Sequence, residues 1–262
     1  MRIISKHFVS VGLSATLVLM TCMPAAANAI ATRGTGVPAA ISAIAQSQFC
    51  TSLQTKASNQ NSKLSTLQTT LSTAESKHTS TLQGNWSTAG TKLSGLQAQW
   101  QTDRNNEYAK LTSLAKTDAE KAAVTTFETT VNTAITTRET ANGAARTTYQ
   151  NGVLAAASTE ATSINTAEST LESTVNGAIS TAEASCQSGS STAASIETTL
   201  KSAITAGKQV YQTTTQSARS TYKSAVTTLQ NTEKATISQN DTTFENTMQS
   251  AITTLKTAFG TA

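Results

Sequence analysis

Large apolar residues recur at intervals of eleven along much of this chain. Seven successive blocks of eleven residues start at Thr125, and each opens with Ser-Thr or Thr-Thr: TTFETTVNTAI, TTRETANGAAR, TTYQNGVLAAA, STEATSINTAE, STLESTVNGAI, STAEASCQSGS and STAASIETTLK. The third, seventh and tenth or eleventh places of a block hold most of its large apolar side chains. Leu171, Val175 and Ile179 illustrate the rule.

Weaker series with the same interval extend the pattern in both directions. Downstream, one series is interrupted by Glu233 and the other by Thr215; their apolar members are Leu200, Tyr211, Tyr222, Phe244 and Leu255, and Ile204, Val226, Ile237, Met248 and Phe259. Upstream, the two series are Leu71, Leu82 and Leu93, and His78, Ala89, Trp100 and Leu111.

This interval predicts α-helix. Eleven residues over three turns is about 3.67 residues per turn, close to the 3.6 of an α-helix, so an apolar stripe runs nearly straight along one face. The period of two that a half-buried strand needs is absent. Thr and Ser are mediocre helix formers, so burial of the stripe against other helices must supply the stability.

Three local signals predict where the helices begin and end. Pro38 suits a first helical turn after the loose segment 30–37. Thr117–Glu120 matches a capping box, which starts a helix near residue 118. Within Ser188–Ser191, the Gly suits a helix end, and Ser190 or Ser191 suits the next N-cap. The predicted helices are 38–116, 118–188 and 191–259.

The near-equal lengths of the last two helices predict an elongated, antiparallel, coiled-coil-like three-helix bundle running up, down and up. Each of these two helices has about 70 residues, or on the order of 105 Å. Three Asn-Gly dipeptides provide the alternative, because Gly weakens a helix interior by about 1 kcal/mol. A break at Asn142-Gly143, Asn151-Gly152 or Asn176-Gly177 would replace this architecture.

The cysteines give an independent check of the predicted turn. If the chain folds back at residue 118, the numbers of facing residues add up to about 236, and those of Cys50 and Cys186 do so. We therefore expect an intrachain disulfide, the alternatives being free thiols or bridges between chains. The same register places Trp100 opposite Thr136 and Trp86 opposite residues 149–152. We expect Gly152 and the alanines at 155–157 to make room for the Trp86 ring.

The N-terminus has the three parts of a secretory signal: Arg2 and Lys6, an apolar run over 8–20, and small residues up to Ala29. We expect cleavage after Ala29 and export, with 38–262 forming a single bundle domain. The apolar run has about 13 residues, short of the roughly 20 that span a bilayer. The alternative is a lipoprotein signal, with lipid on Cys22 after Leu19-Met20-Thr21.

Composition argues against a thick globular core. Thr makes up about a fifth of the chain, whereas aromatic residues make up 4% and charged residues 13%. Small side chains let helices approach closely in a thin bundle. The formal net charge is +4, and two of these charges, Arg2 and Lys6, lie in the signal. Such a low and scattered charge disfavours nucleic acid as a partner.

The residue inventory predicts neither an enzyme nor a metal or cofactor site. His78 is the one histidine after the signal, with no second ligand to complete a zinc site. Glu168 and Glu172 lie one turn apart, and we expect them on a solvated face rather than in acid–base work. Asn142, Arg146 and Glu168 interrupt the apolar stripe. They would face solvent, a partner chain or a polar layer in the core, so the oligomeric state stays open.

These features favour an exported structural or interaction protein, such as a spacer or adhesion rod, with an unknown protein or cell-envelope partner. One alternative binds a lipid or membrane surface, because eleven-residue amphipathic repeats are similar to those of exchangeable apolipoproteins and desiccation-protective proteins. The similarity is in period only, since those repeats carry Lys and Glu at the polar boundary. A periplasmic holdase chaperone is the other alternative.

Overall fold

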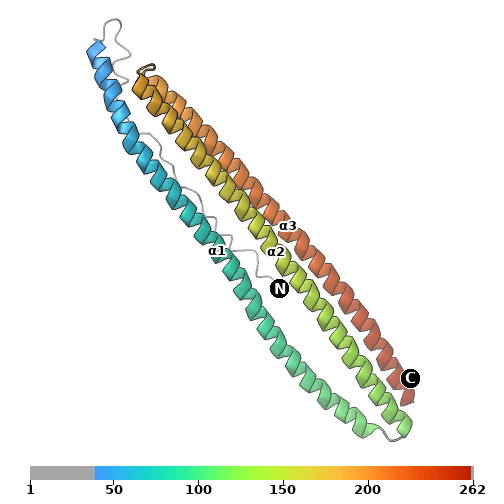
Figure 1. Cartoon of the computed structure of the whole chain (residues 1–262). Coiled ribbons are helices and arrows are strands. Elements are labelled where there is room, and N and C mark those ends of the chain that lie inside the picture. Colours follow the sequence, from blue (N-terminus) through green and yellow to red (C-terminus); the bar gives the residue numbers. More distant parts are fainter. Residues whose placement is uncertain (1–38, 261–262) are drawn as a thin grey trace. The chain divides into compact units, whose positions relative to one another are not determined.

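The computed structural model describes residues 39–260, with side-chain surroundings from residue 46 onward. Its three helices are α1 (Ala39–Leu114), α2 (Asp118–Ser188) and α3 (Ala193–Ala258) (Figure 1). The described part of the chain contains no strand. The chain is an all-α three-helix bundle, and α2 runs unbroken through all three Asn-Gly dipeptides. The predicted signal and the tail before Ala39 lie outside the described residues.

The helices form two compact units, each built from a part of all three helices. The first unit combines the described part of α1 up to Leu64 with Thr170–Val210. The second combines Ser65–Ser169 with the remainder of α3 from Tyr211. α1 and α2 lie antiparallel in each unit, because residues that meet have numbers adding up to between 235 and 240, as in Gln46 with Ser191 and Trp86 with Tyr149.

The turn between α1 and α2 is the predicted capping box. The Thr117 hydroxyl accepts a hydrogen bond from the Glu120 N–H at 3.2 Å, and the Glu120 carboxylate accepts one from the Thr117 N–H at 2.8 Å. The Lys116 N–H donates to the same carboxylate at 2.7 Å. These bonds satisfy backbone donors that a helix start leaves without intrahelical partners.

The turn between α2 and α3 ends α2 as predicted but begins α3 later. Gly189 has a φ of 64°, the left-handed conformation that Gly adopts at a helix C-terminus without steric cost. The prediction of Ser190 or Ser191 as the N-cap was wrong. The Thr192 hydroxyl accepts the Ser195 N–H at 3.3 Å instead, because the two serines lie in the turn, where Ser190 bonds to Ser188.

The eleven-residue stripe forms the core, most completely in the first unit. Leu171, Val175 and Ile179 are buried, and Leu200 and Ile204 of α3 are buried with them. In the second unit Tyr211 and Tyr222 are buried, whereas Phe244 and Leu255 are half-buried. The stripe therefore marks the packed face of α2 and α3 in both units.

The polar interruptions of the stripe are accommodated inside the bundle. Thr215 is buried, and its hydroxyl donates to the Tyr211 carbonyl at 2.7 Å, so the hydroxyl hydrogen of Thr215 has an acceptor. Asn142 is 6% exposed and bonds to α3. Of the three environments considered for Asn142, a polar layer within the core is the one observed.

The packing around Gly152 differs from the prediction. A Cβ on Gly152 would lie 2.6 and 2.9 Å from the two Cδ atoms of Leu229, so Gly152 makes room for Leu229 of α3. Trp86 lies against Tyr149, with ring centroids 6.4 Å apart and ring planes 72° apart. The prediction was wrong about Trp86 because it considered two facing helices and omitted the third. Trp100 is 50% exposed.

Candidate functional site

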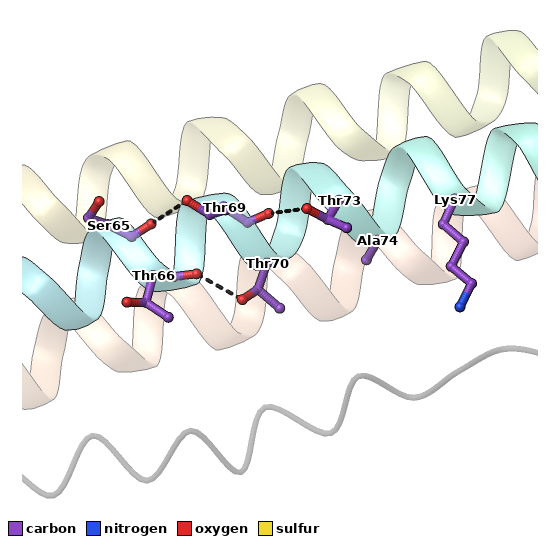
Figure 2. A pocket seen from close by; sticks show the side chains of 7 residues that line it. All are labelled: Ser65, Thr66, Thr69, Thr70, Thr73, Ala74 and Lys77. Atoms are coloured by element: carbon purple, nitrogen blue, oxygen red, sulfur yellow. Dashed lines mark hydrogen bonds between the residues drawn. The ribbon is translucent and has the colours of Figure 1, made fainter.

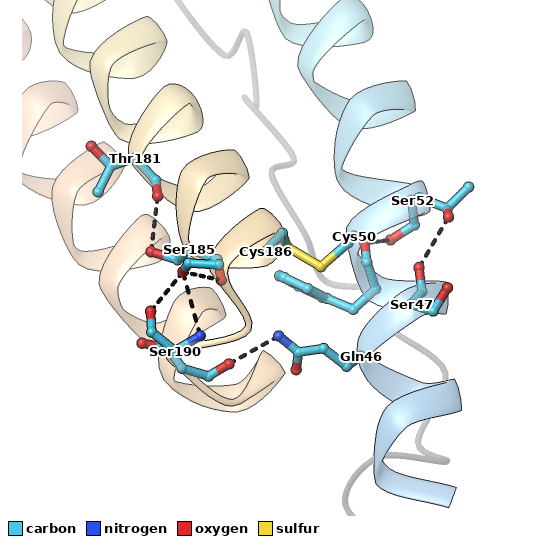
Figure 3. The surroundings of a disulfide bond; sticks show 12 residues. Gln46, Ser47, Cys50, Ser52, Thr181, Ser185, Cys186 and Ser190 are labelled. Carbon is cyan, nitrogen blue, oxygen red and sulfur yellow. Dashed lines mark hydrogen bonds between the residues drawn. A yellow bond between two sulfur atoms is a disulfide. The ribbon is translucent and has the colours of Figure 1, made fainter. Parts of the chain in front are cut away.

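The first unit carries the predicted disulfide between Cys50 of α1 and Cys186 of α2 (Figure 3). The sulfur atoms are 2.04 Å apart and the Cα atoms 5.8 Å apart. The two residues are 136 positions apart in the sequence. The Gln46 side chain, one turn earlier in α1, donates to the Ser191 carbonyl at 2.9 Å, so a hydrogen bond and a covalent bond hold α1 beside the α2–α3 turn. A disulfide suggests an oxidising environment.

In the second unit a polar layer joins α2 to α3. Nε of Arg138 donates to Oδ1 of Asp241 at 2.8 Å, and Nδ2 of Asn142 donates to the same oxygen at 3.4 Å. Nδ2 of Asn240 donates to Oδ1 of Asn142 at 2.9 Å, and the Arg138 guanidinium lies 4.7 Å from the centre of the Phe244 ring. The layer satisfies groups on both helices in one register, and sliding α3 by a turn would separate them.

A second polar group of the same unit joins all three helices. Nε2 of His78 in α1 lies 3.2 Å from the Tyr222 hydroxyl in α3, and their rings meet edge to face. Glu75 of α1 accepts a hydrogen bond from Nδ2 of Asn165 in α2 at 3.5 Å. Glu160 of α2 interacts electrostatically with Arg219 of α3 and with Glu75. We call Glu75, His78, Glu160, Arg219 and Tyr222 the three-helix cluster.

Burial shifts the titration of this cluster. Burial raises the pKa of Glu160, the Arg219 guanidinium opposes that shift, and the Glu75 carboxylate adds to it. Burial lowers the pKa of His78 below 6.5. Burial, together with the charge of Glu160 and with Tyr149, raises the pKa of Tyr222 to about 12. Near neutral pH, His78 and Tyr222 are therefore uncharged, and Glu160 gives up its proton less readily than an exposed glutamate does.

The prediction that Glu168 and Glu172 lie on a solvated face is correct for Glu172 alone. Glu172 is exposed, but Glu168 is 2% exposed and interacts electrostatically with Tyr211 of α3. Residues 164, 167, 171 and 175 are buried on the same face of α2, so Glu168 lies within the packed stripe. Sequence spacing places both residues on one side of the helix, but it does not tell which of them meets the third helix.

The exposed faces are covered by hydroxyl groups in one repeated conformation. Most exposed Thr side chains donate their hydroxyl hydrogen to the carbonyl four residues earlier, as Thr69 does to Ser65 at 3.0 Å and Thr73 does to Thr69 at 2.8 Å. Figure 2 shows this conformation in a shallow hollow of about 490 Å³ on α1. Its described lining comes from α1 alone: Ser65, Thr66, Thr69, Thr70, Thr73, Ala74 and Lys77. Because these hydroxyl hydrogens are already donated to backbone carbonyls, the surface presents methyl groups and oxygen lone pairs to a partner.

A second hollow, of about 400 Å³, lies between α1 and α2 in the second unit. Its lining combines Trp86 with amide and hydroxyl side chains: Gln83, Trp86, Ser87, Gly90, Gln150, Asn151 and Leu154. The Trp86 ring and the surrounding amides could contact the backbone or an aromatic side chain of a protein partner. We call this hollow the Trp86 groove.

Within residues 39–260, no three His, Cys, Asp or Glu side chains lie close enough together to hold a metal ion. In the same range no helix is both long and apolar enough to cross a membrane. Comparison of the whole chain with known proteins gave no matching family model, curated protein or solved structure.

Proposed function

We propose that this chain is an exported, non-enzymatic structural or interaction protein that acts as a spacer or adhesion rod of the cell envelope. The observation that carries the proposal is a set of three uninterrupted helices of 76, 71 and 66 residues, with a disulfide between α1 and α2. At 1.5 Å per residue, each is on the order of 100 Å long. Such lengths are suited to holding a partner at a distance.

The surface chemistry supports the same proposal. A hydroxyl-rich face built from repeated units presents similar contacts at each repeat, as in other repeat proteins. The Trp86 groove is the part of the described surface that best suits a partner, because aromatic side chains contribute strongly to protein interfaces. Export through the signal in 1–29, with cleavage after Ala29, is part of the proposal, and the disulfide supports an oxidising destination.

Fractionation of the native cells tests the proposal. We would separate medium, wall, periplasm and membrane, detect the mature chain by immunoblot, and sequence its N-terminus. Retention in the envelope through a salt wash, with a chain that begins at residue 30, is the expected result. A chain that begins with a lipidated Cys22 would replace the proposed signal cleavage with a lipid anchor. Free recovery from the medium would contradict an envelope rod.

One observation favours the holdase as a second candidate. α1 has no buried residue between Leu71 and Tyr108, so this part of α1 could separate from α2 and α3 to admit a client. Purified protein should then suppress aggregation of an unfolded client at near-equimolar ratio. Loss of that suppression when α1 is cross-linked to α2 would distinguish the holdase from a rod, whose envelope retention needs no opening.

A further inference from the structure

One side of α1 in the second unit carries exposed apolar side chains. Among the described residues four large apolar side chains are exposed, and three of them lie here: Leu96, Trp100 and Leu114. Their spacings of four and 18 residues are close to one and five helical turns, so they lie along one side of the helix. Leu96 and Trp100 are 47% and 50% exposed, and they form an apolar pair in a surface that is otherwise rich in hydroxyl groups. Such a patch indicates an interaction surface.

Charged side chains flank this apolar pair. Lys92 lies one turn before the pair, and Asp103 and Glu107 lie within the two turns after it; all three are exposed. Glu107 forms an exposed ion pair with Lys110, whereas the side chains of Lys92 and Asp103 form none with the described residues. Arg104 is half-buried and its Nε is buried, so it lies on the packed side of α1. We call Lys92, the apolar pair, Asp103 and Glu107 the α1 strip.

The order of charges decides which partner the α1 strip suits. A strip that faces lipid is continuously apolar with Lys or Arg at its edges, whereas Asp103 and Glu107 lie within this one. The order basic, apolar, apolar, acidic is complementary to its own reverse. An identical helix running in the opposite direction brings acidic residues to Lys92 and apolar residues to the apolar pair. Such self-complementarity is what a two-fold symmetric dimer requires.

We propose that a second copy of this chain packs antiparallel on the α1 strip, with the two-fold axis beside residue 98. The numbers of facing residues then add up to 196. Leu96 of each copy faces Trp100 of the other, which removes the apolar pair from water. Lys92 of each copy faces the turn that holds Asp103 and Glu107 of the other. This pairing is independent of the proposed spacer role.

Charge selects this register over the other one that pairs exposed leucines. Facing Leu96 with Leu114 requires residue numbers that add up to 210, and it places Asp103 of one copy against Glu107 of the other. Like charges so placed repel and disfavour that register. In the proposed register Leu114 instead faces Leu82, a half-buried residue of the same helix. Apolar residues therefore meet apolar residues at three levels of the interface, and the acidic residues meet Lys92.

Sedimentation velocity of the disulfide-bonded chain, over a range of concentrations, tests the pairing. We expect a monomer–dimer equilibrium that shifts toward monomer as salt is raised, because salt screens exposed charges. Trp100→Ala should weaken dimerisation by about a hundredfold, since about tenfold is lost at each of the two symmetric contacts. Val210→Ala removes a similarly exposed apolar side chain from α3 and should leave the equilibrium unchanged.

Charge reversal tests the antiparallel register itself. Lys92→Glu brings negative charge to the acidic residues of the other copy, and Asp103→Lys/Glu107→Lys brings positive charge to Lys92. Each variant alone should dimerise about tenfold more weakly than wild type. An equimolar mixture of the two should associate as well as wild type, because opposite charges meet at both ends of the mixed dimer. The substituted side chains are exposed, so circular dichroism should show unchanged helix content.

Three outcomes would overturn the proposal. The first is a wild-type chain that stays monomeric at every concentration. If that monomer floats with phosphatidylglycerol vesicles and Trp100→Ala abolishes flotation, the α1 strip binds lipid instead. The second is a dimer that Trp100→Ala leaves unchanged, which would place the interface elsewhere. The third is a mixture of the two charge-reversed variants that associates no better than either variant alone, because the antiparallel register predicts rescue.

Discussion

Single residues decide how closely α2 and α3 approach, and Gly152 gives the sharpest case. Replacing an interior Gly with Ala favours a helix by about 1 kcal/mol. A Cβ at Gly143 meets nothing within 4 Å, whereas one at Gly152 meets the Leu229 side chain at 2.6 Å. We expect Gly143→Ala to raise the free energy of unfolding by about 1 kcal/mol, and Gly152→Ala to raise it less or lower it. Urea unfolding of both variants measures this order. An equal increase in the free energy of unfolding for both variants would mean that the Leu229 side chain can move aside without cost.

The ion pair between Arg138 and Asp241 is a second test at this scale. Both side chains are 39% exposed, so solvent weakens their attraction, but Asp241 also accepts from Asn142. We expect Asp241→Ala to lower the free energy of unfolding by about 1 kcal/mol, because two donors lose their acceptor. Glu107→Ala, which breaks the exposed pair with Lys110, should cost about 0.5 kcal/mol or less. A cost for Asp241→Ala no larger than that for Glu107→Ala would show that the layer adds nothing to stability.

At the scale of the helix, the capping box links stability to pH. Backbone N–H groups of Thr117 and Lys116 lower the pKa of Glu120 below 4.5. This lowered pKa gives Glu120 a stabilising contribution that is complete above 4.5 and is lost as pH falls through the folded-state pKa. Glu120→Gln should therefore be less stable than wild type at pH 7, and the difference should shrink on acidification. Thermal melts across this range, with Glu172→Gln as the exposed control, measure it. A difference that does not change with pH would contradict the role of the carboxylate.

Much of this fold is readable from the sequence because the signals are local or repetitive. The eleven-residue interval identifies the helices, and the capping box and Gly189 mark two of their ends. Facing positions of α1 and α2 follow from the turn, which is why Cys50 and Cys186 could be paired. Contacts with α3 were harder to predict from the sequence. Both the contact of Leu229 with Gly152 and the burial of Glu168 depend on how the three helices are rotated about their axes. Rotation is set by packing, which a one-dimensional pattern does not contain.

The three-helix cluster was missed for the same reason. Its members lie far apart in the sequence, from Glu75 and His78 to Arg219 and Tyr222, and nothing in their local spacing unites them. His78 belongs to one of the apolar series of α1, and it is half-buried. The interruptions of the apolar series by Glu168 and Glu233 were the available signs that carboxylates enter this core. A pair of such interruptions on facing helices is a signal worth following in other long bundles.

For the whole molecule, the disulfide adds a covalent link between α1 and α2 to the apolar contacts of the first unit. Its closed loop contains most of α1 and α2, and loop-entropy arithmetic gives about 5 kcal/mol as an upper limit for its stabilisation. Phe49, Leu53 and Leu64 of α1 are buried in the first unit as well, so we expect reduction to weaken that unit rather than unfold it. A fall in the urea midpoint on adding reductant, greatest by hydrogen exchange in 46–64, is the expected result.

The control for this prediction is the double variant Cys50→Ser/Cys186→Ser, which should match the reduced wild type and show no response to reductant. If reduction left the wild-type midpoint unchanged, the apolar contacts of α1 would suffice and the bridge would serve another purpose. If the double variant were instead far less stable than the reduced protein, burial of the serine hydroxyls would explain part of the loss. The comparison therefore separates the covalent constraint from the packing around it. In a spacer, the covalent constraint matters most when a force pulls on the chain. The disulfide then keeps α1 attached to α2, whereas the half-buried contacts between these helices would break.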